Sequence, residues 1–455
     1  MATETIFFCT DCGHESGKWL GQCPGCGSWN SFTEQPRMRP KKVERRPTVP
    51  PRGDGPISVV DAAESTTPRI LSKVEGVDRV LGGGFVPGSL VLLSGEPGVG
   101  KSTLLLQVAA AFAEKERPAL YVSAEESAQQ VALRAQRIDG IRSGLMLHAE
   151  TSCEAVLTHL GDSEPAVIVI DSVQSLVSED VDSLAGSPNQ VRAVAARFQH
   201  IAKTRGVPVV LVGHVTKDGL IAGPKVLEHL VDVVLSLEGE PGHDLRVLRA
   251  TKNRFGTVSE MALFSMTGNG LEAVSNPSAW MLEDRRPGSP GSVVAVALEG
   301  TAPLLVEVQA LVSPSNLGTP RRVAHGLDNS RLSLLLAVLE RHTRIHFGDK
   351  DVFVNLVGGL TLREPGLDLA IAAALLSSVS DRPFPADTAV FGEIGLMGEV
   401  RAVSRATERV REAAALGFES VALPARDADG HFDLPVKAVR DVAGLLAFLG
   451  STSKE

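Results

Sequence analysis

The segment with the clearest chemistry is a glycine-rich run that ends in Lys-Ser. It fits the pattern G-x-x-x-x-G-K-[S/T] without a mismatch. An apolar run of strand length precedes it, and helix-forming residues follow it. In this context the glycines let backbone N–H groups turn toward phosphates, Lys101 reaches the β- and γ-oxygens, and Ser102 offers a hydroxyl to Mg²⁺. The pattern predicts a nucleotide site formed by Gly95, Glu96, Pro97, Gly98, Val99, Gly100, Lys101, Ser102 and Thr103.

Carboxylates and a histidine follow other apolar runs of strand length. Asp171 ends one run, where a Walker B aspartate would organise Mg²⁺. Glu125 follows another at the spacing of a RecA-type glutamate that orients and deprotonates water, with Glu126 and a plain helix-start acid as the alternatives. His214 ends a third run. Because the carboxyl ends of parallel strands gather ligand groups, we expect Glu125, Asp171 and His214 to point toward the nucleotide.

Lys252 and Arg254 lie two residues apart after a predicted strand over residues 244–250. On an extended chain both side chains project to one side, so they can reach one target. By analogy with ring ATPases of the DnaB type, we predict that they reach the γ-phosphate of a neighbouring subunit, where a guanidinium stabilises charge in the transition state. A solvated basic turn is the alternative.

Four of the five cysteines form two C-x-x-C pairs, each followed by glycine: Cys9, Cys12, Cys23 and Cys26. Two such turns place four thiolates around one tetrahedral Zn²⁺, and the segment is too small to fold on apolar surface alone. We therefore predict a structural zinc ribbon, because a redox C-x-x-C would need only one pair beside a βαβ unit. We expect the ribbon's aromatic side chains to pack within it rather than form an interaction face: Trp19, Trp29 and Phe32.

Length and composition indicate several globular domains. The chain has 455 residues, 43% of them hydrophobic, and a net charge of −9, which gives no global attraction to nucleic acid. It has no apolar run long enough to span a membrane and no signal peptide, so we expect a cytoplasmic protein without membrane contact. The predicted order is a zinc ribbon (1–35), a basic Pro-rich linker (36–66), an α/β ATPase domain with a mostly parallel sheet (67–275) and a second α/β segment (276–455).

One loop of the ATPase domain, residues 214–229, has no evident part in nucleotide chemistry. In RecA-like sheets the loops after such strands line a central channel. We therefore predict that Lys217 and Lys225 contact DNA, with an ordinary mobile surface loop as the alternative.

Four stretches together resemble the bacterial RadA (Sms) family of DNA repair proteins. They are the cysteine ribbon, Leu81–Gly84, Ile170–Gln174 and Thr251–Gly256, the last containing the family's Lys-Asn-Arg-Phe-Gly signature. The resemblance covers nearly the whole chain. It implies a RecA-like, DNA-stimulated ATPase that uses ATP, Mg²⁺ and Zn²⁺, forms homo-hexameric rings and processes recombination intermediates by branch migration on single-stranded and branched DNA. A RecA-type recombinase or a replicative helicase is the implied protein partner.

The C-terminal segment resembles the proteolytic domain of Lon, most clearly over residues 363–371 and 391–400. That protease uses a Ser/Lys dyad, and the corresponding positions here are Asp368 and Thr407, neither of which can supply its chemistry. We therefore expect a proteolytically inactive, Lon-like scaffold.

The sequence thus favours a motor ATPase in which ATP binds between subunits, Glu125 positions water, and Lys252 and Arg254 act on the neighbour's site. The alternative is an ATP-switched hexameric scaffold, or a regulator related to proteases, without motor activity.

Overall fold

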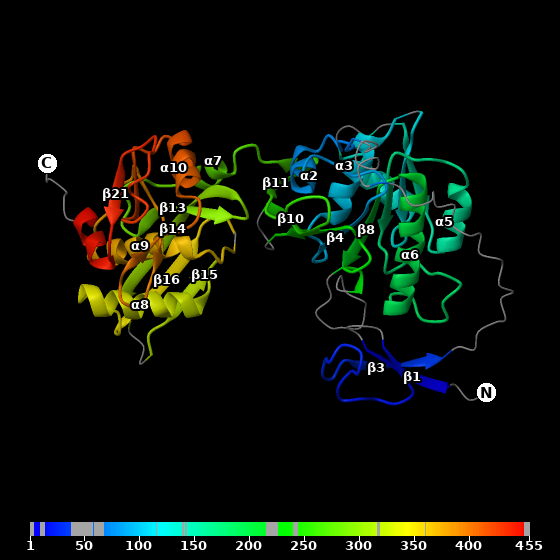
Figure 1. Ribbon diagram of the computed structural model, residues 1–455, viewed down its shortest axis with the longest axis horizontal. Coiled ribbons are helices and arrows are strands. Elements are labelled where there is room, and N and C mark those ends of the chain that lie inside the picture. Colours follow the sequence, from blue (N-terminus) through cyan, green and yellow to red (C-terminus); the bar gives the residue numbers. More distant parts are fainter. Residues whose placement is uncertain are drawn as a thin grey trace. The chain divides into compact units, whose positions relative to one another are not determined.

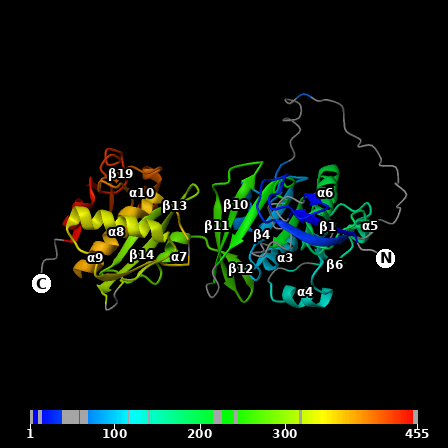
Figure 2. The same ribbon diagram turned by 90° about the horizontal axis from the view of Figure 1, so that it is seen from below.

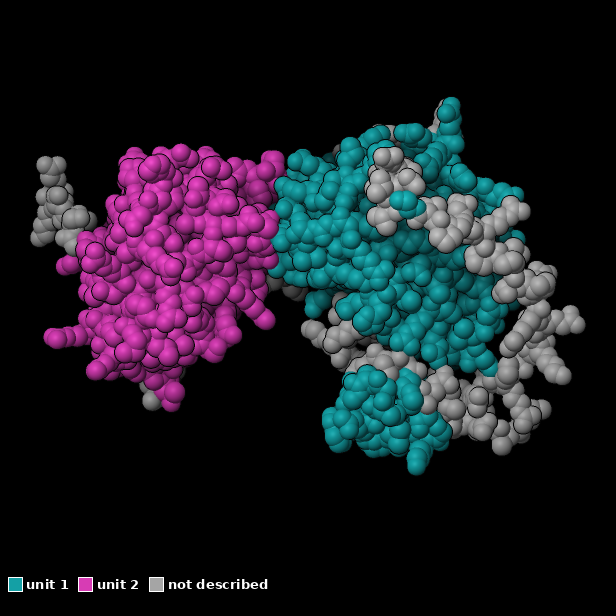
Figure 3. Space-filling model, viewed as in Figure 1, with its two compact units in different colours: residues 1–238, 246–273 teal, residues 239–245, 274–455 magenta. Residues whose placement is uncertain are grey.

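The computed structural model describes residues 4–9, 14–37, 58, 68–114, 116–138, 141, 143–214, 226–239, 244–315, 319–359 and 361–449. The chain divides into two compact units (Figure 3). The first comprises residues 1–238 and 246–273, and the second comprises residues 239–245 and 274–455. No helix among the described residues is both long enough and apolar enough to cross a membrane.

The N-terminal ribbon is a small antiparallel sheet in the order β2-β1-β3. Its strands are β1 (Glu4–Cys9), β2 (Glu15–Ser16) and β3 (Phe32–Arg37). Phe32 is buried beside Cys9 and Cys23, as expected. The prediction that both tryptophans pack within the ribbon is wrong: Trp19 is 51% exposed and Trp29 is 70% exposed. Among the described residues, the buried cluster of the ribbon consists of Cys9, Cys23 and Phe32, and neither indole ring belongs to it.

The rest of the first unit is built on one nine-stranded sheet, in the order β12-β11-β10-β9-β4-β8-β7-β5-β6 (Figure 1). The strands are β4 (Leu90–Gly95), β5 (Ala119–Ser123), β6 (Leu145–Ala149), β7 (Ile168–Asp171), β8 (Val209–His214), β9 (Val233–Glu238), β10 (Leu245–Asn253), β11 (Met261–Thr267) and β12 (Gly270–Ala273). The six strands from β9 to β6 run parallel, whereas β10 is antiparallel to β9.

Helices cover both faces of this sheet (Figure 2). Val91 and Leu93 of β4 enter the core lined by α2, α3 and α4, while Leu90 and Leu92 enter the core lined by α5 and α6. The two cores follow from the alternation of side chains along a strand that is buried on both sides. The helices are α2 (Glu75–Leu81), α3 (Lys101–Phe112), α4 (Ala128–Ala135), α5 (Cys153–Leu160) and α6 (Pro188–Arg205).

Local sequence fixes the ends of α6, the helix whose Gln199 and Lys203 bond to Leu230 and Asp232. Its N-cap is Ser187, whose hydroxyl accepts from the Gln190 N–H, and Pro188 occupies the first turn. Gly206 ends the helix with a φ of 66°, a conformation that favours glycine. Lys203 therefore lies in the last turn, near the amino end of β8.

The second unit is a mixed seven-stranded sheet in the order β15-β16-β14-β13-β17-β20-β21, with a separate hairpin of β18 and β19. Helix α9 is buried along most of its length, and its continuous apolar sequence agrees with a central position. The elements are α7 (Pro277–Leu282), β13 (Ser292–Glu299), β14 (Ala302–Pro314), β15 (Arg322–His325), α8 (Asn329–Thr343), β16 (Lys350–Leu356), η2 (Pro365–Leu367), α9 (Asp368–Ser380), β17 (Thr388–Val390), β18 (Glu393–Ile394), β19 (Val400–Arg401), α10 (Ala406–Ala415), β20 (Ser420–Pro424), β21 (Val436–Val439) and η3 (Val442–Leu449).

Candidate functional site

The glycine-rich run forms a loop between the end of β4 and the start of α3. Gly100 caps α3 with a φ of 110°, and a Cβ atom there would lie 2.7 Å from Met266 Cε. The positive φ favours glycine at this position, because residues with a Cβ atom rarely adopt that conformation. The first turn of α3 has backbone N–H groups without partners inside the helix, and such groups bind anions. The loop thus fits the phosphates of a nucleotide.

Lys101, the first residue of α3, is buried within this loop. Its Nζ donates to Gly95 O at 2.9 Å and to Glu96 O at 2.8 Å. Burial lowers the pKa of Lys101, and the charges of Asp171 and Glu125 act in the opposite direction. The ammonium is therefore close enough to both carboxylates for their charges to matter.

Asp171 ends β7, two strands away from β4, and is 8% exposed. Tyr121, the only tyrosine of the chain, donates its hydroxyl to Asp171 Oδ2 at 2.5 Å. Burial and the neighbouring Asp171 raise the pKa of Tyr121 well above its usual value, so the phenol stays a donor. This bond fixes the carboxylate that we assign to Mg²⁺ together with Ser102, the second residue of α3. The sequence analysis did not identify Tyr121, although a lone tyrosine in an apolar strand was a usable signal.

Glu125 lies at the centre of a polar cluster at the same edge of the sheet. Its Oε1 accepts from Ser172 Oγ at 2.5 Å and from Ser175 Oγ at 2.9 Å. His214 Nε2 lies 3.3 Å from the same oxygen, an ion-pair distance outside hydrogen-bond geometry. Interaction with His214, opposed by burial and aided by the two hydroxyls, lowers the pKa of Glu125 to about 2. The carboxylate is therefore ionised at neutral pH, and none of these contacts uses Oε2.

Glu126 is engaged elsewhere. Its Oε1 accepts from Arg134 Nη2 of α4 at 2.6 Å, and its backbone N–H donates to Ser123 Oγ at 3.1 Å. Of the two candidates, the geometry therefore favours Glu125 as the residue that positions water.

Lys252 and Arg254 lie at the other end of the strands, beside the amino ends of the parallel strands. Strand β10 continues to Asn253, three residues beyond the predicted end, with a register shift between Ala250 and Lys252. Because β10 is antiparallel to β9, its final residues meet the amino ends of the parallel strands. Lys252 Nζ donates to Val231 O at 2.9 Å, and Arg254 Nη1 donates to Asp232 Oδ1 at 3.3 Å.

Arg69, which the sequence analysis did not identify, links the two glycine-containing motifs of the core. Its Nη2 donates to Phe255 O at 2.6 Å, and its Nη1 donates to Leu81 O at 2.8 Å and Gly84 O at 3.2 Å. Asn253 Nδ2 also approaches Leu81 O, at 3.4 Å. The Lys-Asn-Arg-Phe-Gly segment is thus fixed on the turn that follows α2.

Three cysteines of the ribbon converge: the sulfur atoms of Cys9, Cys23 and Cys26 lie within 4.8 Å of one another. Cys9 Sγ and Cys26 Sγ are 3.6 Å apart. Tetrahedral Zn²⁺ with Zn–S bonds of about 2.3 Å would hold its sulfur ligands roughly 3.8 Å apart. The three thiols fit zinc. Three other predicted site residues lie outside the described residues: Cys12, Lys217 and Lys225.

The two positions predicted to replace a protease dyad differ in exposure. Asp368 is 1% exposed and accepts from Arg331 Nε at 2.8 Å and from the Ile394 N–H at 3.1 Å. The bond to Asp368 raises the pKa of Arg331. Thr407 is exposed in the first turn of α10. Asp368 is thus the ion-pair partner of Arg331, and the absence of a protease dyad stays a prediction.

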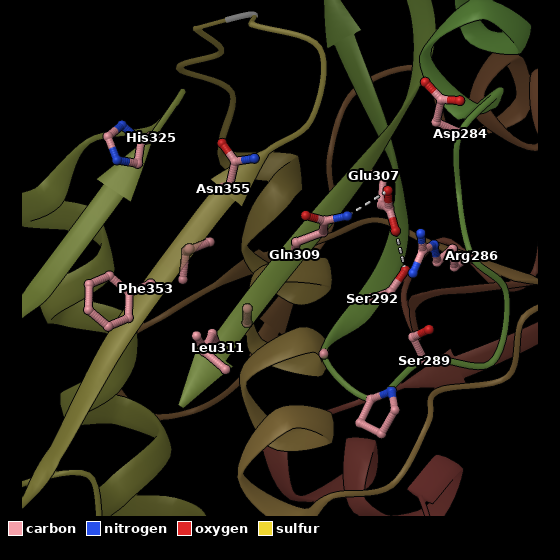
Figure 4. A pocket seen from close by; sticks show the side chains of 14 residues that line it. Asp284, Arg286, Ser289, Ser292, Glu307, Gln309, Leu311, His325, Phe353 and Asn355 are labelled. Carbon is pink, nitrogen blue, oxygen red and sulfur yellow. Dashed lines mark hydrogen bonds between the residues drawn. The ribbon is translucent and has the colours of Figure 1, made fainter. Parts of the chain in front are cut away.

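A pocket of about 380 Å³ lies elsewhere in the second unit. Figure 4 shows its buried Glu307, which accepts hydrogen bonds from the Ser292 hydroxyl and the Gln309 amide. None of the residues singled out from the sequence lines this pocket.

Known proteins resemble this chain in parts and as a whole. Family models match for an AAA domain over residues 64–220, a rubredoxin metal-binding domain over residues 7–34 and subunit ChlI of Mg-chelatase over residues 329–427. DNA repair protein RadA of Halalkalibacterium halodurans is 47% identical over 428 residues, which cover 94% of each chain. DNA repair protein RadA of Bacillus subtilis is 46% identical over 436 residues, again 94% of each chain. The chain belongs to the DNA repair protein RadA family.

Solved structures also match the chain in part. The RadB recombinase is 25% identical with a TM-score of 0.37, covering 45% of this chain and 99% of that one. A KaiC-like protein from Pyrococcus horikoshii OT3 is 22% identical with a TM-score of 0.37, covering 46% of this chain and 99% of that one.

The family assignment confirms several predictions. The chain is an ATPase of a DNA repair family, with an N-terminal zinc ribbon and an α/β core built on a mostly parallel sheet. An AAA domain implies a bound nucleotide, and the cysteine cluster implies a metal ion. The Lon-like nature of the second unit and the roles of individual site residues stay predictions.

We predict that Cys23→Ser loses the metal and unfolds the ribbon while nucleotide binding by the core stays nearly unchanged. Cys23 is 1% exposed, and the buried cluster around it in the described part of the ribbon is small, so we expect the ribbon to depend on the metal for its stability. Metal analysis and nucleotide titration measure the two effects. Cys153→Ser, a change at a buried cysteine of the ATPase core, is the control and should keep its metal. Full metal occupancy in Cys23→Ser would contradict the prediction.

We predict that Glu125→Gln lowers the turnover of ATP by about 10²-fold or more, the range of a positioned general base, with little loss of ATP affinity. The matched variant Glu126→Gln loses its ion pair with Arg134 but should keep most of the turnover. Steady-state hydrolysis and equilibrium binding of ATP separate the two effects. A larger loss of turnover in Glu126→Gln would reverse the assignment.

Proposed function

We propose that this protein is a DNA-dependent ATPase that moves along single-stranded DNA and drives branch migration in homologous recombination and repair. It acts as a ring of identical subunits, in the cytoplasm, with one ATP between each pair of neighbours. ATP and Mg²⁺ serve the motor, and Zn²⁺ holds the ribbon. The family membership and the AAA domain support this proposal.

The observation that supports this proposal most is that two sets of functional groups lie at opposite ends of the strands of one sheet. Asp232, which pairs with Arg254, also bonds to Leu90 at the amino end of β4, whereas the phosphate loop begins at Gly95 at the carboxyl end. Five residues of strand span roughly 16 Å. Arg254 therefore lies too far away to reach the phosphates bound by its own chain, which supports its action on the nucleotide of a neighbouring subunit.

The residues then divide the hydrolysis between two subunits. Glu125 orients a water molecule through Oε2 and accepts its proton as the water oxygen bonds to the γ-phosphorus and the bond to the bridging oxygen of ADP breaks. Lys101 holds the β- and γ-oxygens, and Ser102 and Asp171 would hold Mg²⁺, which would neutralise phosphate charge. Arg254 and Lys252 of the neighbour meet the charge that develops in the transition state.

DNA is the proposed regulator and track of the motor. The curated relatives are named DNA repair proteins, which supports a nucleic-acid substrate. Lys217 and Lys225 are the proposed contacts to single-stranded or branched DNA, because they lie in the loop that follows His214 in the sequence. A recombinase or a replicative helicase is the proposed protein partner, and six is the proposed number of subunits.

The test of this function is the ATPase rate with and without single-stranded DNA. We predict that DNA raises the rate severalfold, and that the increase shrinks steeply with added salt because phosphate contacts are ionic. A scaffold without motor activity would hydrolyse ATP at one rate in both conditions and would not move a branch point. That result would refute the motor.

We also predict that two inactive variants restore each other's activity in mixed rings. Lys101→Ala removes phosphate contacts within its own subunit, whereas Arg254→Ala should keep ATP affinity and lose about 10³-fold in turnover, the low end for arginine fingers. A Lys101→Ala subunit still offers an intact Arg254 to an Arg254→Ala neighbour. Titrating one variant into the other, with subunit labels to show that mixed rings form, should therefore raise DNA-stimulated hydrolysis above the sum of the two variants alone. Activity that never exceeds that sum would place Arg254 outside the neighbour's site.

A further inference from the structure

Asp232 is a buried carboxylate to which the hydrolysis described above gives no role. It directly precedes β9 and is 3% exposed. Its Oδ2 accepts from the Leu90 N–H at 3.0 Å and from Lys203 Nζ at 2.7 Å, and its Oδ1 faces Arg254. Burial raises the pKa of Asp232, but Lys203, the Leu90 N–H and Arg254 outweigh it, so the pKa lies below its usual value. The carboxylate is thus charged and held in place by the sheet.

Asp232 accepts two hydrogen bonds from Arg254, one from its backbone and one from its side chain. The Arg254 N–H donates to Asp232 O at 3.1 Å, and the guanidinium donates through Nη1 to the carboxylate at 3.3 Å. The side chain of Arg254 is still 51% exposed, and Nη1 is its only guanidinium nitrogen with a bond to a described residue. One side of the guanidinium is therefore anchored while its remaining donors face outward.

The same short segment also anchors Lys252, whose Nζ donates to Val231 O at 2.9 Å and to Glu228 O. Helix α6 also bonds to residues 228–232, because Gln199 Nε2 donates to Leu230 O at 2.6 Å. Lys203, Lys252 and Arg254 thus surround one buried carboxylate, with Glu228 as the other acid nearby. The cluster has an excess of positive charge, which suits a polyphosphate anion.

We propose that Asp232 is a positioning residue: it holds the Arg254 guanidinium in the orientation in which it meets the neighbouring subunit's ATP. This inference rests on the proposed action of Arg254 across the subunit boundary. Asp232 itself touches no reacting atom. Its effect is to keep the arginine side chain in one orientation, so that this side chain need not be ordered anew at each turnover.

A purely structural role is the competing explanation, because Asp232 also joins the amino ends of β4 and β9. The two roles differ in what they affect. A structural defect lowers stability and the fraction of folded protein, and its effects add to those of Arg254→Ala. A positioning defect lowers kcat with little change in KM and disappears once Arg254 has been removed.

The experiment compares Asp232→Asn with Asp78→Asn in the full-length protein, with ATP as substrate and saturating single-stranded DNA. Asp78 is a matched control: it is 9% exposed, lies in the same unit and accepts from the Ser72 and Lys73 N–H groups at 2.8 and 3.1 Å. We expect Asp232→Asn to lower kcat by about 10- to 100-fold, the scale of a small misplacement, with KM for ATP nearly unchanged. Asp78→Asn should lower thermal stability but keep kcat per folded subunit.

The double variant Asp232→Asn/Arg254→Ala decides between the two roles. We expect its kcat to equal that of Arg254→Ala alone. A further drop in the double variant, or an unchanged kcat in Asp232→Asn, would overturn the inference. If Asp232→Asn does not fold, Asp232→Glu keeps the charge and shifts the anchor by one methylene, and the same criteria apply to it.

The same data separate the inference from the function on which it rests. If Arg254→Ala keeps full turnover, the proposed action of Arg254 fails, and the inference fails with it. If Arg254→Ala is impaired and Asp232→Asn is not, only the inference is wrong.

Discussion

The direction of the strands in the large sheet is the constraint on which the site depends. Parallel pairing of β4, β8, β7 and β5 brings the phosphate loop, His214, Asp171 and Glu125 to one edge, although they are far apart in the sequence. The reversal at β10 takes Lys252 and Arg254 to the other edge. In the proposed function, this reversal is what divides the reaction between two copies of the chain.

Each edge contains one buried carboxylate that is hydrogen-bonded to other elements of the sheet. At the nucleotide edge Tyr121 holds Asp171, and at the far edge Asp232 collects Leu90, Lys203 and Arg254. A buried charge without partners is strongly unfavourable, so each carboxylate constrains the groups around it. At the far edge the partners are long cationic side chains that would otherwise sample many rotamers in solvent.

The sequence predicted the functional groups that lie in short local motifs. Short spacing defines the phosphate loop and the cysteine pairs. An apolar run followed by a carboxylate indicates a group at the carboxyl end of a parallel strand. Both patterns can be seen in the sequence. Arg69 and Tyr121 were missed because their partners lie up to 186 residues away and depend on tertiary packing. Trp19 and Trp29 were misplaced for the converse reason: apolar character favours burial, but in a segment this small both indole rings lie outside the buried cluster of the described residues. The end of β10 was placed too early because a register shift interrupts the alternation from which strand ends are judged.

The second unit contains two ion pairs with a buried member, and one of them includes Asp368, a position that we compared with a protease dyad. Asp368 is paired with Arg331, and Glu364 accepts from the fully buried Arg409 at 2.7 Å, while Arg409 also approaches the Phe391 ring at 5.3 Å. Removing one member of such a pair typically costs about 3–5 kcal/mol, because the other charge is left buried alone. A nucleophile and its activating amine must instead change protonation and approach a substrate. We therefore expect Asp368, at the start of α9, to contribute to the rigidity of the unit rather than to peptide hydrolysis.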